Sequence, residues 1–62
     1  MKFEKYSQNL RLEGNDVYSY NTLVAKRVGH RLVQLGYWSV TTQKHINYAA
    51  KVLFLELDKT QY

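Results

Sequence analysis

The sequence predicts a small α+β protein, with a three-stranded antiparallel β-meander followed by one C-terminal helix packed on one face. Two short glycine-containing turns, at residues 13–16 and 29–30, separate runs rich in Val, Tyr, Thr and Leu, which favour strands. From residue 41 onward, apolar residues recur at helical spacing. A chain of 62 residues has room for a single small domain, residues 1–62, with a thin core.

The first strand is predicted over about residues 8–13, where apolar and polar residues alternate. Gly14 and the asparagine after it tolerate positive φ, so a hairpin turn should follow this strand. Residues 17–28 form the second predicted strand. Because this run is long for one strand, we expect a bulge or bend near Ser19 or Asn21.

The third strand is predicted over about residues 31–39, after a two-residue turn at Gly29 and His30 that suits type II′ geometry. This turn pairs Val28 with Arg31 and fixes which residues share a face. One face is predicted to be apolar and to meet the core: Val24, Val28, Val33, Leu35 and Tyr37. The other face is mixed and is predicted to be partly exposed: Leu23, Ala25, Arg27, Leu32, Gln34 and Trp38.

The last element is predicted to be a helix over about residues 41–57, capped by Thr41 or Thr42. Its sheet-facing stripe contains Ile46, Ala49, Ala50, Leu53 and Leu57, and a second apolar line contains Tyr48, Val52 and Leu55. In an alternative interpretation the helix ends near Lys51 and residues 52–57 form a short fourth strand. Periodicity does not separate the two, and the longer helix is the interpretation adopted.

Positive charge is concentrated in the middle of the chain. Nine Lys and Arg against five Asp and Glu give a formal net charge of +4, and residues 17–55 contain no acidic residue. A region that carries only positive charge attracts polyanions or acidic protein surfaces, although it can also simply keep a small protein soluble. The cations in this region are Lys26, Arg27, Arg31, Lys44 and Lys51.

The tip of the central hairpin is the first candidate site. A two-stranded ribbon can enter a DNA major groove, where arginine pairs with guanine. We expect the tip cations to have no counter-ion nearby, and we expect Lys44 and Lys51 to be additional phosphate contacts. A simpler interpretation is that hairpin tips are naturally polar. The predicted nucleic-acid-binding residues are Lys26, Arg27, His30, Arg31, Lys44 and Lys51.

Aromatic residues are numerous for the length: six Tyr, two Phe and one Trp. They could build the core, stack on bases, or anchor a protein partner, since Tyr, Trp and Arg dominate such anchors. The predicted protein-interface residues are Leu23, Leu32, Trp38, Tyr48, Val52 and Leu55, and the last three could also pair two copies of the chain in a homodimer. Gly36 lacks a side chain, so another group can approach the backbone there.

Several functional classes are not supported. The chain has no cysteine, and its two histidines have no metal-ligand spacing, so neither a disulfide nor a metal site is expected. No paired carboxylates, glycine-rich phosphate loop or nucleophile–base arrangement occurs, so we expect no catalytic residues, no cofactor and no enzyme activity. No apolar signal segment or run of about 18 apolar residues occurs, which predicts a cytoplasmic protein with no membrane contact.

Two elements of the chain resemble those of a group of small bacteriophage proteins. Residues 18–22 read Tyr-Ser-Tyr-Asn-Thr, and residues 39–47 match Ser-x-Thr-Thr-x-Lys-His-Ile-Asn. The resemblance covers about residues 17–50, with a variable hairpin between the two elements. It implies phage origin and action in the cytoplasm of an infected bacterium, and it implies no site roles. Because the variable hairpin is the basic one here, its cations would not serve a function common to the group.

The sequence therefore predicts a small, non-catalytic phage accessory protein that acts by binding a macromolecule. The leading target is nucleic acid, bound through the basic β-hairpin. The alternative is an inhibitor or adaptor that binds a bacterial host protein through an aromatic and apolar surface, with the positive charge steering it toward an acidic partner.

Overall fold

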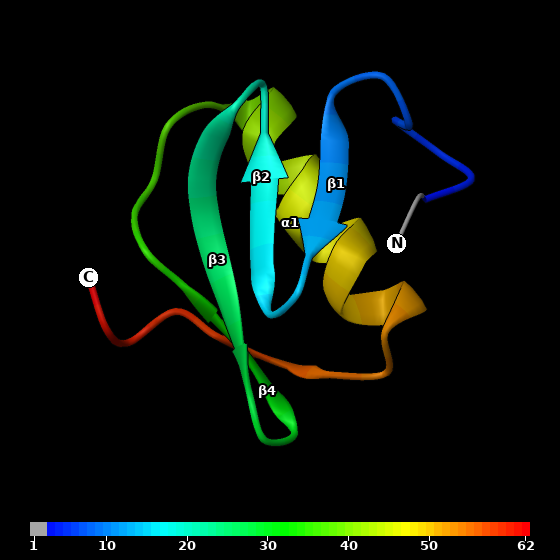
Figure 1. The fold of residues 1–62 in the computed structure, drawn as a ribbon. Coiled ribbons are helices and arrows are strands. Elements are labelled where there is room, and N and C mark those ends of the chain that lie inside the picture. Colours follow the sequence, from blue (N-terminus) through cyan, green and yellow to red (C-terminus); the bar gives the residue numbers. More distant parts are fainter. Residues whose placement is uncertain (1–2) are drawn as a thin grey trace.

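The computed structural model describes residues 3–62, which form a sheet with one helix packed against one of its faces (Figure 1). In chain order the elements are β1 (Leu10–Glu13), β2 (Asp16–Ser19), β3 (Thr22–Val28), β4 (Arg31–Gln34), α1 (Val40–Val52) and β5 (Glu56–Asp58). The strands lie in the order β1-β2-β3-β4-β5, with β1 to β4 antiparallel and β5 parallel to β4. The described residues thus form an α+β protein with a largely antiparallel sheet, but with five strands instead of three.

Both predicted glycine turns are tight hairpins. Gly14 and Gly29 have φ of +62° and +59°, a region that glycine adopts without a steric clash. At the second turn Val28 pairs with Arg31, so the predicted register is confirmed. The strand after this turn is shorter than predicted, because residues 35–39 leave the sheet to reach α1.

The chain reverses inside the run predicted to be one strand. Tyr20 and Asn21 have φ of +52° and +65°, as the two central residues of a type I′ turn require. Residues 17–28 therefore contribute to both β2 and β3, and the prediction of one strand is wrong. A type I′ turn needs positive φ at both central residues. Asparagine tolerates this conformation but tyrosine rarely adopts it, so only one of the two residues marks the turn in the sequence.

A bulge lies in β3. Val17 of β2 pairs with Ala25 of β3. The next residue, Tyr18, pairs with Leu23, so Val24 is an extra residue in β3. Val24 and Ala25 are both fully buried, although neighbouring residues of a regular strand point to opposite faces. The bulge therefore exchanges the two faces of the strand beyond it.

This exchange overturns the predicted assignment of the core face. Of the face predicted to meet the core, Val24 is buried as expected, but Val28, Leu35 and Tyr37 are exposed and Val33 is half-buried. Of the face predicted to be partly exposed, Ala25, Leu32 and Gln34 are completely buried. A one-residue shift in a strand moves every later side chain to the other face, which explains the reversal.

The helix is shorter than predicted at its C-terminal end. Ser39 is the N-cap, because its Oγ accepts a 3.1 Å hydrogen bond from the backbone N–H of Thr42, and the predicted caps Thr41 and Thr42 lie within the helix. The prediction of a helix to residue 57 is wrong. The alternative of a short strand within residues 52–57 is closer, because β5 pairs its backbone with the free edge of β4.

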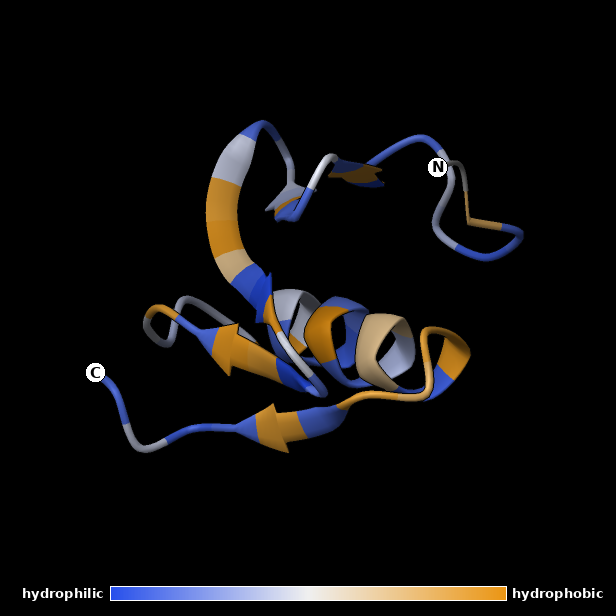
Figure 2. Ribbon diagram, turned by 60° about the horizontal axis from the view of Figure 1, so that its bottom comes forward, coloured by the Kyte–Doolittle hydropathy of each residue, from blue (hydrophilic) through white to orange (hydrophobic). Residues whose placement is uncertain are grey.

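The core lies between the sheet and α1. Its buried apolar side chains are Phe3, Leu10, Leu12, Val17, Val24, Ala25, Leu32, Ile46, Ala49 and Ala50. The last three confirm the predicted sheet-facing stripe of the helix. Figure 2 shows the hydrophobic residues 52–55 leading from the end of α1 toward β5. The face of the sheet that α1 does not cover, toward the viewer in Figure 1, is called the open sheet face below.

Candidate nucleic-acid interface

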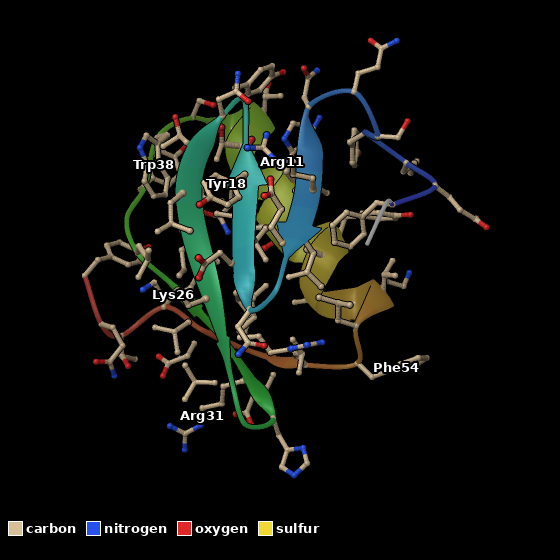
Figure 3. All side chains as sticks on the ribbon, viewed as in Figure 1. Arg11, Tyr18, Lys26, Arg31, Trp38 and Phe54 are labelled. Atoms are coloured by element: carbon tan, nitrogen blue, oxygen red, sulfur yellow. The ribbon has the colours of Figure 1, made fainter. Side chains whose placement is uncertain are left out.

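The predicted basic hairpin tip does not form one cluster. Lys26 and Arg31 project from the open sheet face (Figure 3). His30 is exposed in the turn. Arg27 pairs with the buried Leu32, so it points to the helix side of the sheet. The Nε of Arg27 donates a 3.3 Å hydrogen bond to the side-chain oxygen of Asn15. The four cationic or titratable side chains are thus divided between two faces and a turn.

Carboxylates of neighbouring strands balance the hairpin cations. Arg31 Nη1 lies 3.8 Å from Asp58 Oδ2. Asp16 is the cross-strand partner of Lys26, a position in which β-carbons lie about 5 Å apart. The carboxylates on the open sheet face are Glu13, Asp16, Glu56 and Asp58, and the cations are Arg11, Lys26 and Arg31. Four negative charges against three positive charges leave this face slightly negative. The expectation that the tip cations have no counter-ion nearby is therefore wrong.

The carboxylate that pairs with Arg31 is fixed by its own turn. Thr60 donates two hydrogen bonds to Asp58 Oδ1, one from Oγ1 at 2.6 Å and one from its backbone N–H at 2.9 Å. These bonds, the side-chain bond first, lower the pKa of Asp58, and the charge of Arg31 lowers it less. Asp58 therefore stays ionised at neutral pH and continues to offset Arg31.

Positive charge with no acidic residue on the same element lies on α1 instead. Lys44 and Lys51 are both exposed on α1, and two helical turns separate them, about 10.5 Å along the axis. Thr41 and Asn47 are exposed on the same side, and α1 contains no acidic residue. We call this surface the basic helix face; it consists of Thr41, Lys44, Asn47 and Lys51.

The N-terminal segment borders the basic helix face. The backbone N–H of Lys5 donates a 3.1 Å hydrogen bond to the hydroxyl of Tyr48, which lies four residues after Lys44 and three before Lys51. The Tyr48 ring also packs edge-on against Phe3, with ring centroids 6.0 Å apart. Tyr48, predicted to be an interface residue, is therefore largely engaged within the molecule.

A buried polar pair joins the two sequence elements of the phage resemblance. A 2.7 Å hydrogen bond connects Ser19 Oγ in β2 with His45 Nδ1 in α1, and both side chains are almost fully buried. The rings of Tyr6 and Tyr20 lie against the imidazole, with centroids 4.6 Å and 5.4 Å away. Burial lowers the pKa of His45 below its ordinary value of 6.5, so the ring is neutral at neutral pH.

This pair predicts a loss of stability in mild acid. Below about pH 6.5 the unfolded chain binds a proton at His45 that the folded chain resists, so the free energy of unfolding should fall as the pH falls. The slope should not exceed about 1.4 kcal/mol per pH unit, the limit for one proton. Urea titrations between about pH 7 and pH 5 measure it. His45→Leu should flatten the dependence, whereas His30→Gln, in the exposed turn, should retain it.

Most of the predicted protein-interface residues take part in folding. Leu32 is fully buried, so the prediction that it anchors a partner is wrong. Leu23 is half-buried, and three others are half-buried and pack against the core: Tyr48, Val52 and Leu55. Trp38 is 43% exposed. A β-carbon on Gly36 would lie 3.3 Å from the Trp38 indole, so Trp38 is the group that approaches this glycine.

Apart from Trp38, which was predicted to be partly exposed, sequence reasoning missed two exposed apolar features. Residues 35–40 expose four large side chains in succession: Leu35, Tyr37, Trp38 and Val40. Phe54, after the end of α1, is 93% exposed. Figure 3 shows Trp38 and Phe54 on opposite sides of the molecule. The predicted strand over residues 31–39 had placed Leu35 and Tyr37 on the core face, and the predicted long helix had contained Phe54. Val40 lay between these two elements, so no signal marked these four residues as exposed.

Other kinds of site are not found in residues 3–62. Within this range no three or more His, Asp or Glu residues are close enough to hold a metal ion, and no pocket is present. None of the helical structure in the same range is long and apolar enough to span a membrane.

Fold and surface together define a small α+β protein whose notable surfaces are a basic helix face and two exposed apolar features. The chain belongs to a family of unknown function, DUF8033, whose model matches residues 2–60. Neither the curated proteins nor the solved structures compared with the chain gave a match.

Proposed function

We propose that this protein is a small, non-catalytic phage accessory protein that binds nucleic acid through the basic helix face, inside the infected bacterium. The observation that carries the proposal is the separation of charge. Lys44 and Lys51 are exposed on a helix without acidic residues, whereas four of the five carboxylates of the chain project from the open sheet face. The phage origin rests on the resemblance of residues 17–50.

The basic helix face can bind phosphates by simple electrostatics. Each lysine that neutralises a phosphate releases condensed counterions, and this release drives binding without regard to sequence. Thr41 and Asn47 can add hydrogen bonds to phosphate oxygens, which fix the orientation of the protein on the strand. With only two central cations, we expect dissociation constants on the order of 10⁻⁴ to 10⁻⁶ M.

Fluorescence anisotropy with labelled single-stranded and duplex oligonucleotides tests the proposal. Two phosphate contacts predict that the logarithm of the binding constant falls with the logarithm of salt concentration, with a slope of about −1.4 for single strands or −1.8 for duplex DNA. An absence of binding at low salt, or an affinity that salt does not change, would contradict nucleic-acid binding.

A second candidate function is supported by residues 35–40, which expose four large apolar side chains beside the sheet. In this alternative the protein is an inhibitor or adaptor that binds a bacterial host protein, with Trp38 as an anchor, because tryptophan is enriched at binding hot spots. A pull-down from bacterial lysate, with and without nuclease, separates the two functions. A host protein that is retained after nuclease treatment and lost with Trp38→Ala would support this candidate over the first.

A further inference from the structure

Phe54 occupies a backbone position that usually belongs to glycine. After α1 ends, Phe54 has φ of +56°. Its N–H donates to the carbonyl of Lys51 at 3.2 Å, and the N–H of Leu55 donates to the carbonyl of Ala50 at 2.9 Å. These two bonds define a Schellman motif with Phe54 at the left-handed position, where glycine is preferred because a β-carbon is disfavoured. Backbone geometry therefore gives no reason for a phenylalanine here.

Packing gives no reason either. Phe54 is 93% exposed, the highest exposure among the large hydrophobic residues exposed in residues 3–62. The apolar contacts after the helix are made by its neighbours Leu53 and Leu55, which pack against the core. In Figure 3 the Phe54 side chain extends away from the ribbon at the end of α1. The ring is thus presented to solvent on a backbone that hydrogen bonds hold in place.

The surroundings of Phe54 indicate what such a ring could contact. The Phe54 N–H bonds to the carbonyl of Lys51, so the backbone that carries the ring adjoins the backbone of the last cation of the basic helix face, three residues away. Proteins that bind single strands combine cations that follow the backbone with aromatic rings on which bases stack. The flat face of a base is available for such stacking only where it is not already stacked in a duplex.

We propose that Phe54 stacks on an unpaired base while Lys51 and Lys44 contact phosphates of the same strand, so that the ligand is single-stranded nucleic acid. This inference rests on the proposed function and adds to it the class of nucleic acid and an aromatic contact. It assigns a role to a side chain that neither the backbone nor the core requires.

Substitution of Phe54 tests the proposal, with Tyr37→Ala as the matched control. Tyr37 is an aromatic residue that is 58% exposed, before the other end of α1. Phe54→Ala should weaken binding of a single-stranded oligonucleotide by about 5- to 150-fold, the range for loss of one stacked base. The salt slope should not change, because no phosphate contact is removed. Tyr37→Ala should bind like the unmodified protein, and Phe54→Trp should retain the affinity.

Folding is measured in parallel, so that a loss of binding is not confused with unfolding. Phe54→Gly should raise the melting temperature, since glycine suits the left-handed position, and should still lose affinity. The inference is overturned if Phe54→Ala binds single strands as well as the unmodified protein, or if the protein prefers duplex to single strands. The proposed function survives either result if Lys44→Gln/Lys51→Gln weakens binding. A protein that binds no nucleic acid at all overturns both proposals.

Discussion

Leu32→Ala is expected to lower the free energy of unfolding by about 2–5 kcal/mol, the range for truncating a buried leucine. Leu32 is fully buried between the sheet and α1. A domain of this size rarely has more than about 3–5 kcal/mol of stability, so the variant should be substantially unfolded at room temperature. Circular dichroism and urea titration would measure the loss.

Leu35→Ala is the matched control for Leu32→Ala, because it makes the same chemical change at a residue that is 39% exposed. It should change the free energy of unfolding by no more than about 0.5 kcal/mol. The pair of variants tests the bulge at Val24, which decides which face of the hairpin is buried. A damaging Leu35→Ala together with a harmless Leu32→Ala would show that the faces are assigned the wrong way round.

Ser19→Ala is expected to destabilise the protein by about 1–3 kcal/mol, because it leaves the buried His45 Nδ1 without its hydrogen-bond partner. His45→Leu should cost a similar amount by leaving the Ser19 hydroxyl unpaired. The double variant removes both polar groups, so its loss should be smaller than the sum of the two single losses. Thermal melts of the four proteins in this cycle measure the coupling. Strictly additive losses would show that the Ser19–His45 bond does not stabilise the fold.

The sequence predicted those parts of the fold that depend on glycine turns and on helical periodicity. Gly14 and Gly29 form the expected hairpins, and the second sets the expected register. Ile46 and Ala49 face the sheet as expected. In each case the residue type alone favours the observed conformation, either because glycine adopts positive φ or because apolar residues recur on one side of a helix.

Three of the wrongly predicted boundaries lie close to residues that are not glycine yet have positive φ. Tyr20 and Asn21 reverse the chain between β2 and β3, and Phe54 follows the end of α1. Tyr6, with φ of +58°, accepts a hydrogen bond from Leu10, the first residue of β1, which begins later than predicted. Local propensity disfavours such conformations in tyrosine and phenylalanine, so tertiary structure must supply the stabilisation.

The candidate site was predicted only in part, because charge balance depends on strand pairing. Asp16 lies opposite Lys26 only because of the bulge, and Asp58 meets Arg31 only because β5 pairs with β4. Neither contact is visible from the spacing of charges along the chain. Lys44, which was predicted to contact phosphate, is exposed. This exposure could be predicted because the periodicity of a helix decides which of its residues face solvent.

The most direct test of the account compares two charge-matched double variants in oligonucleotide binding. Lys44→Gln/Lys51→Gln removes the central cations of the basic helix face, and Lys26→Gln/Arg31→Gln removes the same formal charge from the open sheet face. The first should weaken binding strongly and reduce the magnitude of the salt slope by about 1.4 for single strands, whereas the second should change neither by much. Equal losses in the two variants, or a loss confined to the second, would contradict the assignment of the nucleic-acid interface to the helix.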